Sequence, residues 1–491
     1  MEALDLARWQ FGITTVYHFV LVPLTIGLSV LVAIMQTMWF KTGHEKWLRL
    51  TKFYGKLLLI NFALGVATGI VQEFQFGMNW SEYSRYVGDI FGAPLAMEAL
   101  IAFFLESTFL GLWIFGWDKL PRSIHLATIW MLALGSTLSA FFIIAANSWM
   151  QHPVGAEYNP ETGRAEMNDV FAVLTNSTAL VAYPHVISTA FLVAGTFVAG
   201  IAVFWMVKKS RANKLDADLP MYRTAARFGA WVMIIAGAGI IITGDEQAKL
   251  MFEQQPIKMA AAEALCDTEQ PAAFSILSVG HLGATDCNDV KTLIKIPGLL
   301  SFLATGDWDA EVTGLNDLQP QYAERYGATT PDGETIHYQP NLLITYWSFR
   351  LMIGLAVFSA ALALTILWTT RKKSYSDQRW MKALAIVSLP MPFLAASFGW
   401  IFTEMGRQPF VVAPNPSGSD QVFLLTQFGV SEVVSAQMVL GSMITFTLVY
   451  AVLGVFWFRL MHRYTVEGAQ PAVVPHNLDE GEAPGPLSFA Y

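Results

Sequence analysis

Charged residues are scarce in this chain of 491 residues. Lys, Arg, Asp and Glu make up 14% of it, roughly half of their share in soluble domains, whereas 54% of the residues are hydrophobic. The net charge is −8, and neither a basic patch nor a zinc-finger spacing favours a nucleic-acid partner. Residues 1–13 have no basic segment and precede a full-length apolar run, so we expect no cleaved signal peptide. The composition argues against a soluble domain and favours one embedded in lipid.

Histidine is also rare where it would matter for metal chemistry. Of nine histidines, only His18 and His185 fall clearly inside apolar segments. A haem–copper oxidase needs a cluster of membrane histidines, so copper fits this chain poorly. Haem remains compatible with the sequence, because single His and Met side chains serve as axial ligands of haem iron.

Long apolar runs are what the sequence has in abundance. Each is about 20 residues or more, enough to cross the hydrocarbon core as a helix. There are nine such runs, and an odd number of spans places the two termini on opposite sides of the membrane. We therefore predict an all-α integral membrane protein, a bundle of nine transmembrane helices. The runs lie near residues 14–39, 57–76, 95–117, 124–148, 180–207, 225–243, 343–369, 383–402 and 432–458.

Basic residues are concentrated in alternate loops of this nine-helix arrangement. Lys and Arg near the ends of membrane segments are retained on the cytoplasmic side. The sequence therefore predicts an N-terminus outside and a C-terminus in the cytoplasm. The basic residues of these loops are Lys41, Lys46, Arg49, Lys52, Lys56, Lys208, Lys209, Arg211, Lys214, Arg371, Lys372, Lys373 and Arg379.

One connection is much longer than the others and divides the chain. We expect helices one to six in residues 1–243, a partly folded outer lobe in residues 244–341, and helices seven to nine in residues 342–463. The tail from residue 464 to 491 is rich in Pro, Gly and acidic residues, so we expect it to be disordered.

Both cysteines, Cys266 and Cys287, lie in the predicted outer lobe, where an oxidising environment favours a disulfide. Closing that loop would contribute about 3 kcal/mol in the chain-entropy model. Two free thiols are the alternative.

A few ionisable side chains fall at membrane depth, where each costs at least about 2.5 to 3.5 kcal/mol on insertion scales. Glu98 and Glu106 lie eight residues apart on one apolar segment, roughly 12 Å apart in depth and about 80° around an α-helix. They favour a proton route over structural carboxylates, whereas a lone membrane His is as often a packing residue and a Met is usually core. The candidates are His18, Glu73, Glu98, Glu106, His185, Arg350, Met352 and Glu404.

Several blocks of sequence together form a specific pattern. They are QFG at 10–12 with His18 and PLT at 23–25, NFALGVATG at 61–69, EFQFG at 73–77, GDIFGAPL at 88–95, Glu98 with AFFLESTF at 102–109, FRLM at 349–352, GW at 399–400 and EMGRQP at 404–409. In these blocks the chain resembles subunit I of the cytochrome bd quinol oxidases, over essentially its whole length.

The resemblance implies three haems. His185 and Met352 would be the axial ligands of a low-spin haem b, with Arg350 beside it. His18 and Glu404 would each ligate one high-spin haem, a b and a d, in an order that stays open.

The resemblance also implies roles around these ligands. Glu98 would be a further iron ligand or a proton donor, and Glu106 and Ser139 would lie on the proton path from the cytoplasm. Trp400 and Trp9 would pack on haem rings, with interfacial anchoring as the alternative.

The quinol site implied by the resemblance lies in the outer lobe, which would be an extracytoplasmic quinol-binding loop. Lys258 and Glu263 match the quinol-site lysine and glutamate of the family, and Arg407 would sit by a haem propionate or near the quinol. A carboxylate can accept a quinol proton while a cation steadies the developing oxygen charge. The lobe is shorter than in long-loop members and carries the Cys266 and Cys287 pair that many relatives lack.

The function implied is that of a terminal respiratory oxidase in the bacterial cytoplasmic membrane. Quinol, either menaquinol or ubiquinol, would be oxidised at the outer face, and O2 would be reduced to water with cytoplasmic protons, which builds a proton motive force without a pump. The expected partners are a second membrane subunit and, as in some members, a small single-helix subunit. The alternatives are a haem-free quinone-linked transporter or proton channel, and a dihaem electron carrier without oxygen chemistry.

Overall fold

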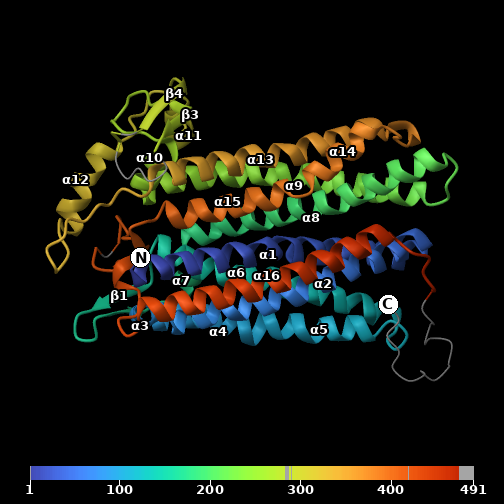
Figure 1. Ribbon diagram of the computed structural model, residues 1–491, viewed down its shortest axis with the longest axis horizontal. Helices are drawn as coiled ribbons and strands as arrows, with labels where there is room; N and C mark the ends of the chain where they lie inside the picture. Colours follow the sequence, from blue (N-terminus) through green and yellow to red (C-terminus); the bar gives the residue numbers. More distant parts are fainter. Residues whose placement is uncertain (1, 282–286, 289, 419, 475–491) are drawn as a thin grey trace.

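The computed structural model describes residues 2–281, 287–288, 290–418 and 420–474. Within these residues, nine helical segments are long and apolar enough to cross a membrane, which confirms the predicted bundle. Figure 1 shows them side by side along one direction, with α1 and α16 in the middle of the view. The segments are α1 (Ala3–Thr42), α2 (Glu45–Gly77), α4 to α5 (Gly88–Phe115), α6 (Arg122–Gln151), α7 (Val170–Leu174) with α8 (Ser177–Ala212), α9 (Leu219–Gln254), α13 (Leu342–Thr369), α14 (Arg379–Ser388) with α15 (Met391–Met405), and α16 (Ala436–Glu467).

Helix α1 is central to the bundle because it contacts α2, α6, α8, α15 and α16. Small residues let the backbones approach closely, as is usual where helices pack without a hydrophobic driving force. A Cβ atom at Gly27 of α1 would lie 2.3 Å from the carbonyl oxygen of Ala190 in α8. Between α8 and α9, a Cβ at Gly229 would lie 2.6 Å from the carbonyl oxygen of Gly195. These contacts fix the positions of the helices that carry both membrane histidines.

The third span is not a uniform α-helix. It begins as α4 (Gly88–Met97), continues as the π-helical segment η1 (Glu98–Phe103), and ends as α5 (Phe104–Phe115). A π-helical turn holds one more residue than an α-helical turn and often marks a functional site. Here it begins at Glu98.

The lobe gathers at one end of the bundle, at the upper left of Figure 1. Its helices enclose a separate core of buried residues that includes Leu300, Leu315 and Tyr338. It consists of α10 (Pro256–Glu263), the antiparallel strands β3 (Phe274–Gly280) and β4 (Val290–Ile296), α11 (Leu299–Thr305) and α12 (Leu315–Tyr326). The same end of the molecule carries α3 (Ser81–Tyr86), the hairpin of β1 (Ala156–Asn159) and β2 (Arg164–Met167), and the strands β5 (Phe410–Val412) and β6 (Leu424–Leu425) with η3 (Thr426–Phe428).

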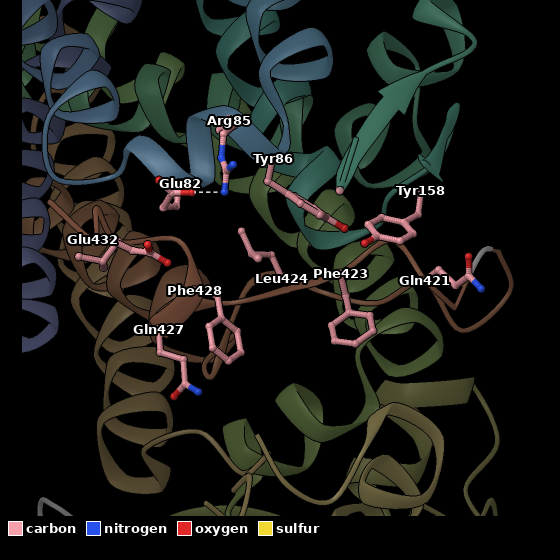
Figure 2. Close-up of a pocket in the computed structure, with 12 residues that line it drawn as sticks. Glu82, Arg85, Tyr86, Tyr158, Gln421, Phe423, Leu424, Gln427, Phe428 and Glu432 are labelled. Atoms are coloured by element: carbon pink, nitrogen blue, oxygen red, sulfur yellow. Dashed lines mark ion pairs between the residues drawn. The ribbon is translucent and has the colours of Figure 1, made fainter. Parts of the chain in front are cut away.

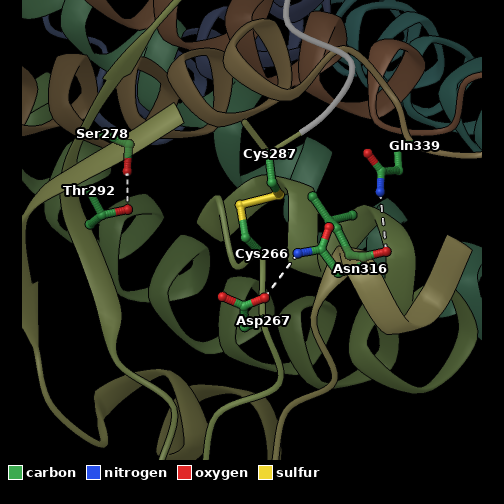
Figure 3. Close-up of a disulfide and its surroundings, with 8 residues drawn as sticks. Cys266, Asp267, Ser278, Cys287, Thr292, Asn316 and Gln339 are labelled. Atoms are coloured by element: carbon green, nitrogen blue, oxygen red, sulfur yellow. Dashed lines mark hydrogen bonds between the residues drawn. A yellow bond between two sulfur atoms is a disulfide. The ribbon is translucent and has the colours of Figure 1, made fainter. Parts of the chain in front are cut away.

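The disulfide between Cys266 and Cys287 is present in the lobe, as predicted, with the two Cα atoms 5.7 Å apart. Figure 3 shows it beside Asp267, whose carboxylate accepts a hydrogen bond of 2.9 Å from the side-chain amide of Asn316. The disulfide therefore joins the segment after α10 to the segment just before β4. The hydrogen bond from Asn316 also links the segment after α10 to the start of α12.

Two predicted limits need correction. Helix α9 continues to Gln254, beyond the expected end at residue 243, and an ion pair of 2.6 Å between Lys249 and Asp245 supports its polar extension. The tail was expected to be disordered from residue 464, but α16 runs to Glu467. Beyond it, Arg49 donates hydrogen bonds to the backbone carbonyls of Ala469 and Gln470. Residues 475–491 of the predicted tail lie outside the described residues.

Candidate functional site

His18 of α1 is held by two consecutive residues of α2. Its Nδ1 atom lies 2.8 Å from the hydroxyl oxygen of Thr68, and a Cβ at Gly69 would lie 3.3 Å from its Cε1. The Thr68 hydroxyl donates its own proton to the backbone carbonyl of Leu64, 3.0 Å away. It can therefore only accept from the ring, which places the proton on Nδ1 and leaves Nε2 with a free lone pair.

His185 of α8 is held in the same way by α9. Its Nδ1 lies 3.0 Å from the hydroxyl oxygen of Thr243, which donates to the carbonyl of Gly239 at 2.7 Å. The next residue is again a glycine, and a Cβ at Gly244 would lie 3.5 Å from the ring Cε1. Both membrane histidines thus rest on a Thr-Gly pair that fixes the tautomer able to bind iron through Nε2.

Met352 of α13 faces α15, because a Cβ at Gly399 would lie 2.9 Å from the methionine sulfur. The next residue, Trp400, stacks on Phe19 with ring centres 5.2 Å apart, one position from His18. Trp400 therefore packs against α1 at the residue after the first histidine. Trp9, in contrast, is 62% exposed near the start of α1.

Glu404 lies at the end of α15 and pairs with the buried guanidinium of Arg407. Its second oxygen accepts a hydrogen bond of 2.9 Å from the side-chain amide of Asn147 in α6. The oxygen of that amide accepts in turn from Gln151 at 3.1 Å. Gln151 completes the series by accepting from the ammonium of Lys258, 2.9 Å away. A continuous row of hydrogen bonds thus joins Lys258 of α10 to Glu404, which we call the α6 amide relay.

Lys258 is buried, and its remaining contacts are the backbone carbonyl of Thr403 at 3.2 Å and the ring of Phe402 at 5.2 Å. Burial, together with the positive charge of Arg407, lowers the pKa of Lys258 to about 7, although the negative charge of Glu404 acts in the opposite direction. The lysine can therefore change its charge near neutral pH.

Glu263 ends α10 and is also buried. Arg350 of α13 donates to its carboxylate at 2.5 Å and to the backbone carbonyl of Ser275 at 2.6 Å. The guanidinium also lies 4.3 Å from the ring of Phe274. Burial raises the pKa of Glu263 to about 7 even though Arg350 acts in the opposite direction. Such a carboxylate can take up and release a proton at neutral pH.

Glu98 and Glu106 both face α6. Glu98 accepts a hydrogen bond of 2.7 Å from the hydroxyl of Ser139, and the Cγ of Glu106 would lie 2.9 Å from a Cβ at Gly135, one turn away on α6. The expected separation of about 80° around the helix is wrong, because the π-helical turn at Glu98 absorbs one residue and brings the two side chains onto nearly the same face.

The residues fit a haem group on two observations. Each histidine presents a free Nε2, and buried N–H groups of Arg407 (Nε and Nη1) and Arg350 (Nη1) have no hydrogen-bond partner among the described residues. Leaving a buried charged donor without an acceptor is costly, so these atoms call for an anion. Haem propionates would supply one, next to Glu404 in the first case and two residues before Met352 in the second.

Four residues of the site were missed from the sequence: Thr68, Thr243, Asn147 and Gln151. The two Thr-Gly pairs are a signal that could have found the first two, since each follows an apolar run in the helix after a histidine. Asn147 and Gln151 are four apart on an otherwise apolar helix, the spacing of a polar row.

A separate surface hollow of about 490 Å³ opens between α3, the β1–β2 hairpin and the segment around β6. Figure 2 shows Glu82 and Arg85 at its edge, paired at 2.5 Å, and Tyr158 and Phe423 along its wall. No residue predicted for the redox site lines it, and we assign it no function.

Comparisons with known proteins agree on one family. The sequence model described as cytochrome bd terminal oxidase subunit I matches residues 6–469. The chain is 42% identical to the cytochrome bd ubiquinol oxidase subunit 1 of Bacillus subtilis (strain 168), over 96% of this chain and 95% of the relative. It is 37% identical to the cytochrome bd-II ubiquinol oxidase subunit 1 of Escherichia coli (strain K12), over 84% and 88%.

A solved structure, that of the bd oxidase from Geobacillus thermodenitrificans, superposes with a TM-score of 0.81 at 25% identity, covering 95% of this chain and 99% of the other. Sequence and fold therefore point to the same family.

Proposed function

The chain belongs to the cytochrome bd terminal oxidase subunit I family, and on that premise we propose that it is the haem-bearing subunit that oxidises quinol at the outer face of the membrane. The enzyme is a quinol:O2 oxidoreductase of the respiratory chain in a bacterial membrane. One observation supports the proposal most: α10 of the lobe contacts two of the four helices that carry expected iron ligands, α13 and α15. Glu263 pairs with Arg350, two residues before Met352, and Lys258 bonds to Thr403, which precedes Glu404.

Quinol chemistry fits the pair on α10. A quinol loses two protons as it loses two electrons, and Glu263 can accept one because burial raises its pKa to about 7. Lys258 can steady the negative charge that develops on the quinol oxygen, in a buried place where such interactions are strong. The quinol would be menaquinol or ubiquinol.

Three haems would be held by the residues of the bundle. His185 and Met352 would hold a low-spin haem b, with Arg350 on a propionate, and His18 and Glu404 would each hold one of a high-spin haem b and a haem d. When bound, these groups would carry electrons from quinol and reduce O2 to water. Trp400 would lie against a ring near His18, whereas Trp9, exposed near the start of α1, would serve as an interfacial anchor.

Protons for water would come from the opposite side of the membrane. Glu106 and Glu98 face α6 at Gly135 and Ser139, so a proton at Glu106 would reach Glu98 along one face of the helix pair. The basic loops support an entry side in the cytoplasm, and the N-terminus and the lobe would then lie outside. Uptake inside and release outside would build a proton motive force without a pump.

The subunit would work with a second membrane subunit and, as in some members, a small single-helix subunit. The members of this family are generally multi-subunit membrane complexes, and the partner would cover part of the exposed apolar surface of the bundle.

The test is quinol-driven oxygen uptake by the purified complex, with Glu263→Gln as the informative variant. We expect a loss of about 100-fold or more, the usual contribution of a positioned base, at unchanged haem content. Glu253→Gln is the matched control, because Glu253 is an exposed carboxylate at the end of α9, ten residues before Glu263. Full uptake by Glu263→Gln would refute the assignment of the base, and a well-folded wild type without quinol-driven uptake would refute the function.

A further inference from the structure

A basic hollow of about 430 Å³ lies at the end of the bundle opposite the lobe. It opens where the end of α8 meets the start of α14, at the right of Figure 1. The two helices pack closely farther along, at the other end of α14, since a Cβ at Gly200 of α8 would lie 2.8 Å from the side chain of Leu389. The hollow is lined by Lys208, Arg211, Arg379, Lys382, Ala383 and Ile386.

The cations of this basic hollow face no carboxylate. Within the described residues, Lys208, Arg379 and Lys382 form no ion pair, and no acidic residue lines the hollow. The nearby carboxylate of Asp377 pairs instead with Lys214 outside the hollow, at 3.3 Å. Four positive side chains therefore converge from two distant segments of the chain without a counter-charge.

Aromatic rings hold two of these cations in place. The ammonium of Lys382 lies 4.4 Å from the ring centre of Phe204, and that of Lys208 lies 5.9 Å from the same ring and 4.2 Å from that of Trp205. Cation–π contacts of this kind restrain long side chains that would otherwise move freely in solvent. Both ammonium groups thus lie within 6 Å of the Phe204 ring centre.

The hollow also has an apolar side. Ile386 in its wall is 48% exposed, and Val387 next to it is 45% exposed. Trp380, one residue after Arg379, is 53% exposed, and exposed indole rings near the ends of membrane helices often serve as anchors at the membrane surface. The retention of basic residues on the cytoplasmic side of a membrane would explain why these residues are positively charged. It does not explain why they converge beside an apolar wall.

We propose that this basic hollow binds the phosphate diester of an anionic phospholipid, with the lysines and arginines on the phosphate and the acyl chains along Ile386 and Val387. Basic pockets between membrane helices recognise such headgroups. Free phosphate shares the charge but lacks the chains. The acidic residues of the segment after Val474 are the rival occupant within the chain. The inference requires only that the chain is embedded in a membrane. It is therefore independent of the redox proposal, and its test can fail without affecting that proposal.

The experiment is native mass spectrometry of the purified complex titrated with dioleoyl phosphatidylglycerol or dioleoyl phosphatidylcholine. We expect preferential retention of phosphatidylglycerol, weakened about thirtyfold in Lys208→Gln/Lys382→Gln, at roughly fivefold for each surface cation. Lys372→Gln/Lys373→Gln is the matched control, because it removes two exposed charges from the turn before α14 that do not line the hollow. Wild-type thermal unfolding of both double variants would show that they fold.

Four results would overturn the proposal. The first is equal retention of the two lipids, and the second is an equal loss in both double variants. The third is retention of phosphatidylglycerol only after the chain is truncated behind Val474, which would assign the hollow to the tail. The fourth is complete displacement of phosphatidylglycerol by an excess of inorganic phosphate, which would show a free-anion site instead.

Discussion

Arg350 and Glu263 form a buried ion pair, with 2.5 Å between Nη2 and Oε2, that joins the lobe to α13. The pair connects the expected quinol base to the helix of Met352. Removing one partner of a buried pair leaves an uncompensated charge, at a cost of about 3 to 5 kcal/mol. Glu263→Gln removes the charge but keeps an oxygen that can accept from Arg350, so it disturbs the pair less than a truncation would.

The pH dependence of quinol oxidation should be bell-shaped with a maximum near neutral pH. Glu263 must be deprotonated to act as a base, and burial raises its pKa to about 7, so kcat/KM should fall as the pH drops below 7. Lys258 must be protonated to steady an oxyanion, and burial lowers its pKa to about 7, so kcat/KM should also fall above 7.

Single variants should remove one side of the bell each. Glu263→Gln should lose the acid limb and Lys258→Gln the alkaline limb, as measured by kcat/KM for a soluble quinol across pH. An acid limb that survives in Glu263→Gln would assign that titration to another group.

The Thr-Gly pairs beneath the two histidines predict a selective effect on haem. Thr243→Val removes the acceptor for Nδ1 of His185 and should weaken retention of the low-spin haem by about 10- to 100-fold. It should also raise the midpoint potential of that haem, because a less basic imidazole stabilises ferric iron less. Thr68→Val should do the same at the haem of His18.

Thr224→Val is the control for Thr243→Val, since Thr224 is an exposed threonine of α9 that makes the same hydrogen bond to the carbonyl four residues earlier. Its haem spectrum and potential should match the wild type. Equal shifts of the haem spectrum and potential in both variants would mean that loss of the threonine's hydrogen bond to the α9 backbone, and not loss of the bond to His185, causes the effect.

The α6 amide relay predicts that two substitutions at Gln151 have different effects on the quinol KM. Gln151→Leu removes both the acceptor for Lys258 and the donor to Asn147, so it should raise the quinol KM about tenfold and shift the high-spin signals that depend on Glu404. Gln151→Glu keeps the acceptor and loses the donor. It should preserve the KM yet still shift the high-spin signals.

Gln254→Leu serves as the control, because within the described part of the chain the side chain of Gln254, at the end of α9, bonds Thr178 and Ser177 at the start of α8 and no residue of the relay. Steady-state kinetics and the visible spectrum of the same preparations give both readouts. A KM raised equally by Leu and Glu at position 151 would argue against the relay.

The proton path predicts slow proton uptake when its carboxylates are neutralised. Glu106→Gln should slow uptake from the side opposite the lobe by about 100-fold. Ser139→Ala, which removes the 2.7 Å hydrogen bond to Glu98, should slow it roughly tenfold. Ser107→Ala, an exposed hydroxyl next to Glu106, should have no effect. Uptake is followed with a pH dye in proteoliposomes, and an unchanged rate in Glu106→Gln would remove this glutamate from the path.

The sequence was sufficient for features set by local composition. Nine apolar runs predict nine spans because length and hydropathy largely decide insertion, and two cysteines in one predicted lobe leave one pairing. Features that depend on contacts between helices could not be predicted from the sequence. The π-helical turn at Glu98 changes which face Glu106 occupies, and only packing against Ser139 and Gly135 shows it. The hydrogen bond from the Arg49 side chain to the backbone carbonyl of Ala469 could not be predicted for the same reason.

The central claim is that this chain holds haem on His18, His185, Met352 and Glu404. The most direct test is a dithionite-reduced minus air-oxidised visible spectrum of the purified complex, with haem extraction from the same sample. The account predicts low-spin b, high-spin b and chlorin-type d signals in the wild type, and loss of a high-spin signal with survival of the low-spin one in Glu404→Gln. A well-folded complex without haem, or one whose high-spin signals are all unchanged in Glu404→Gln, would contradict it.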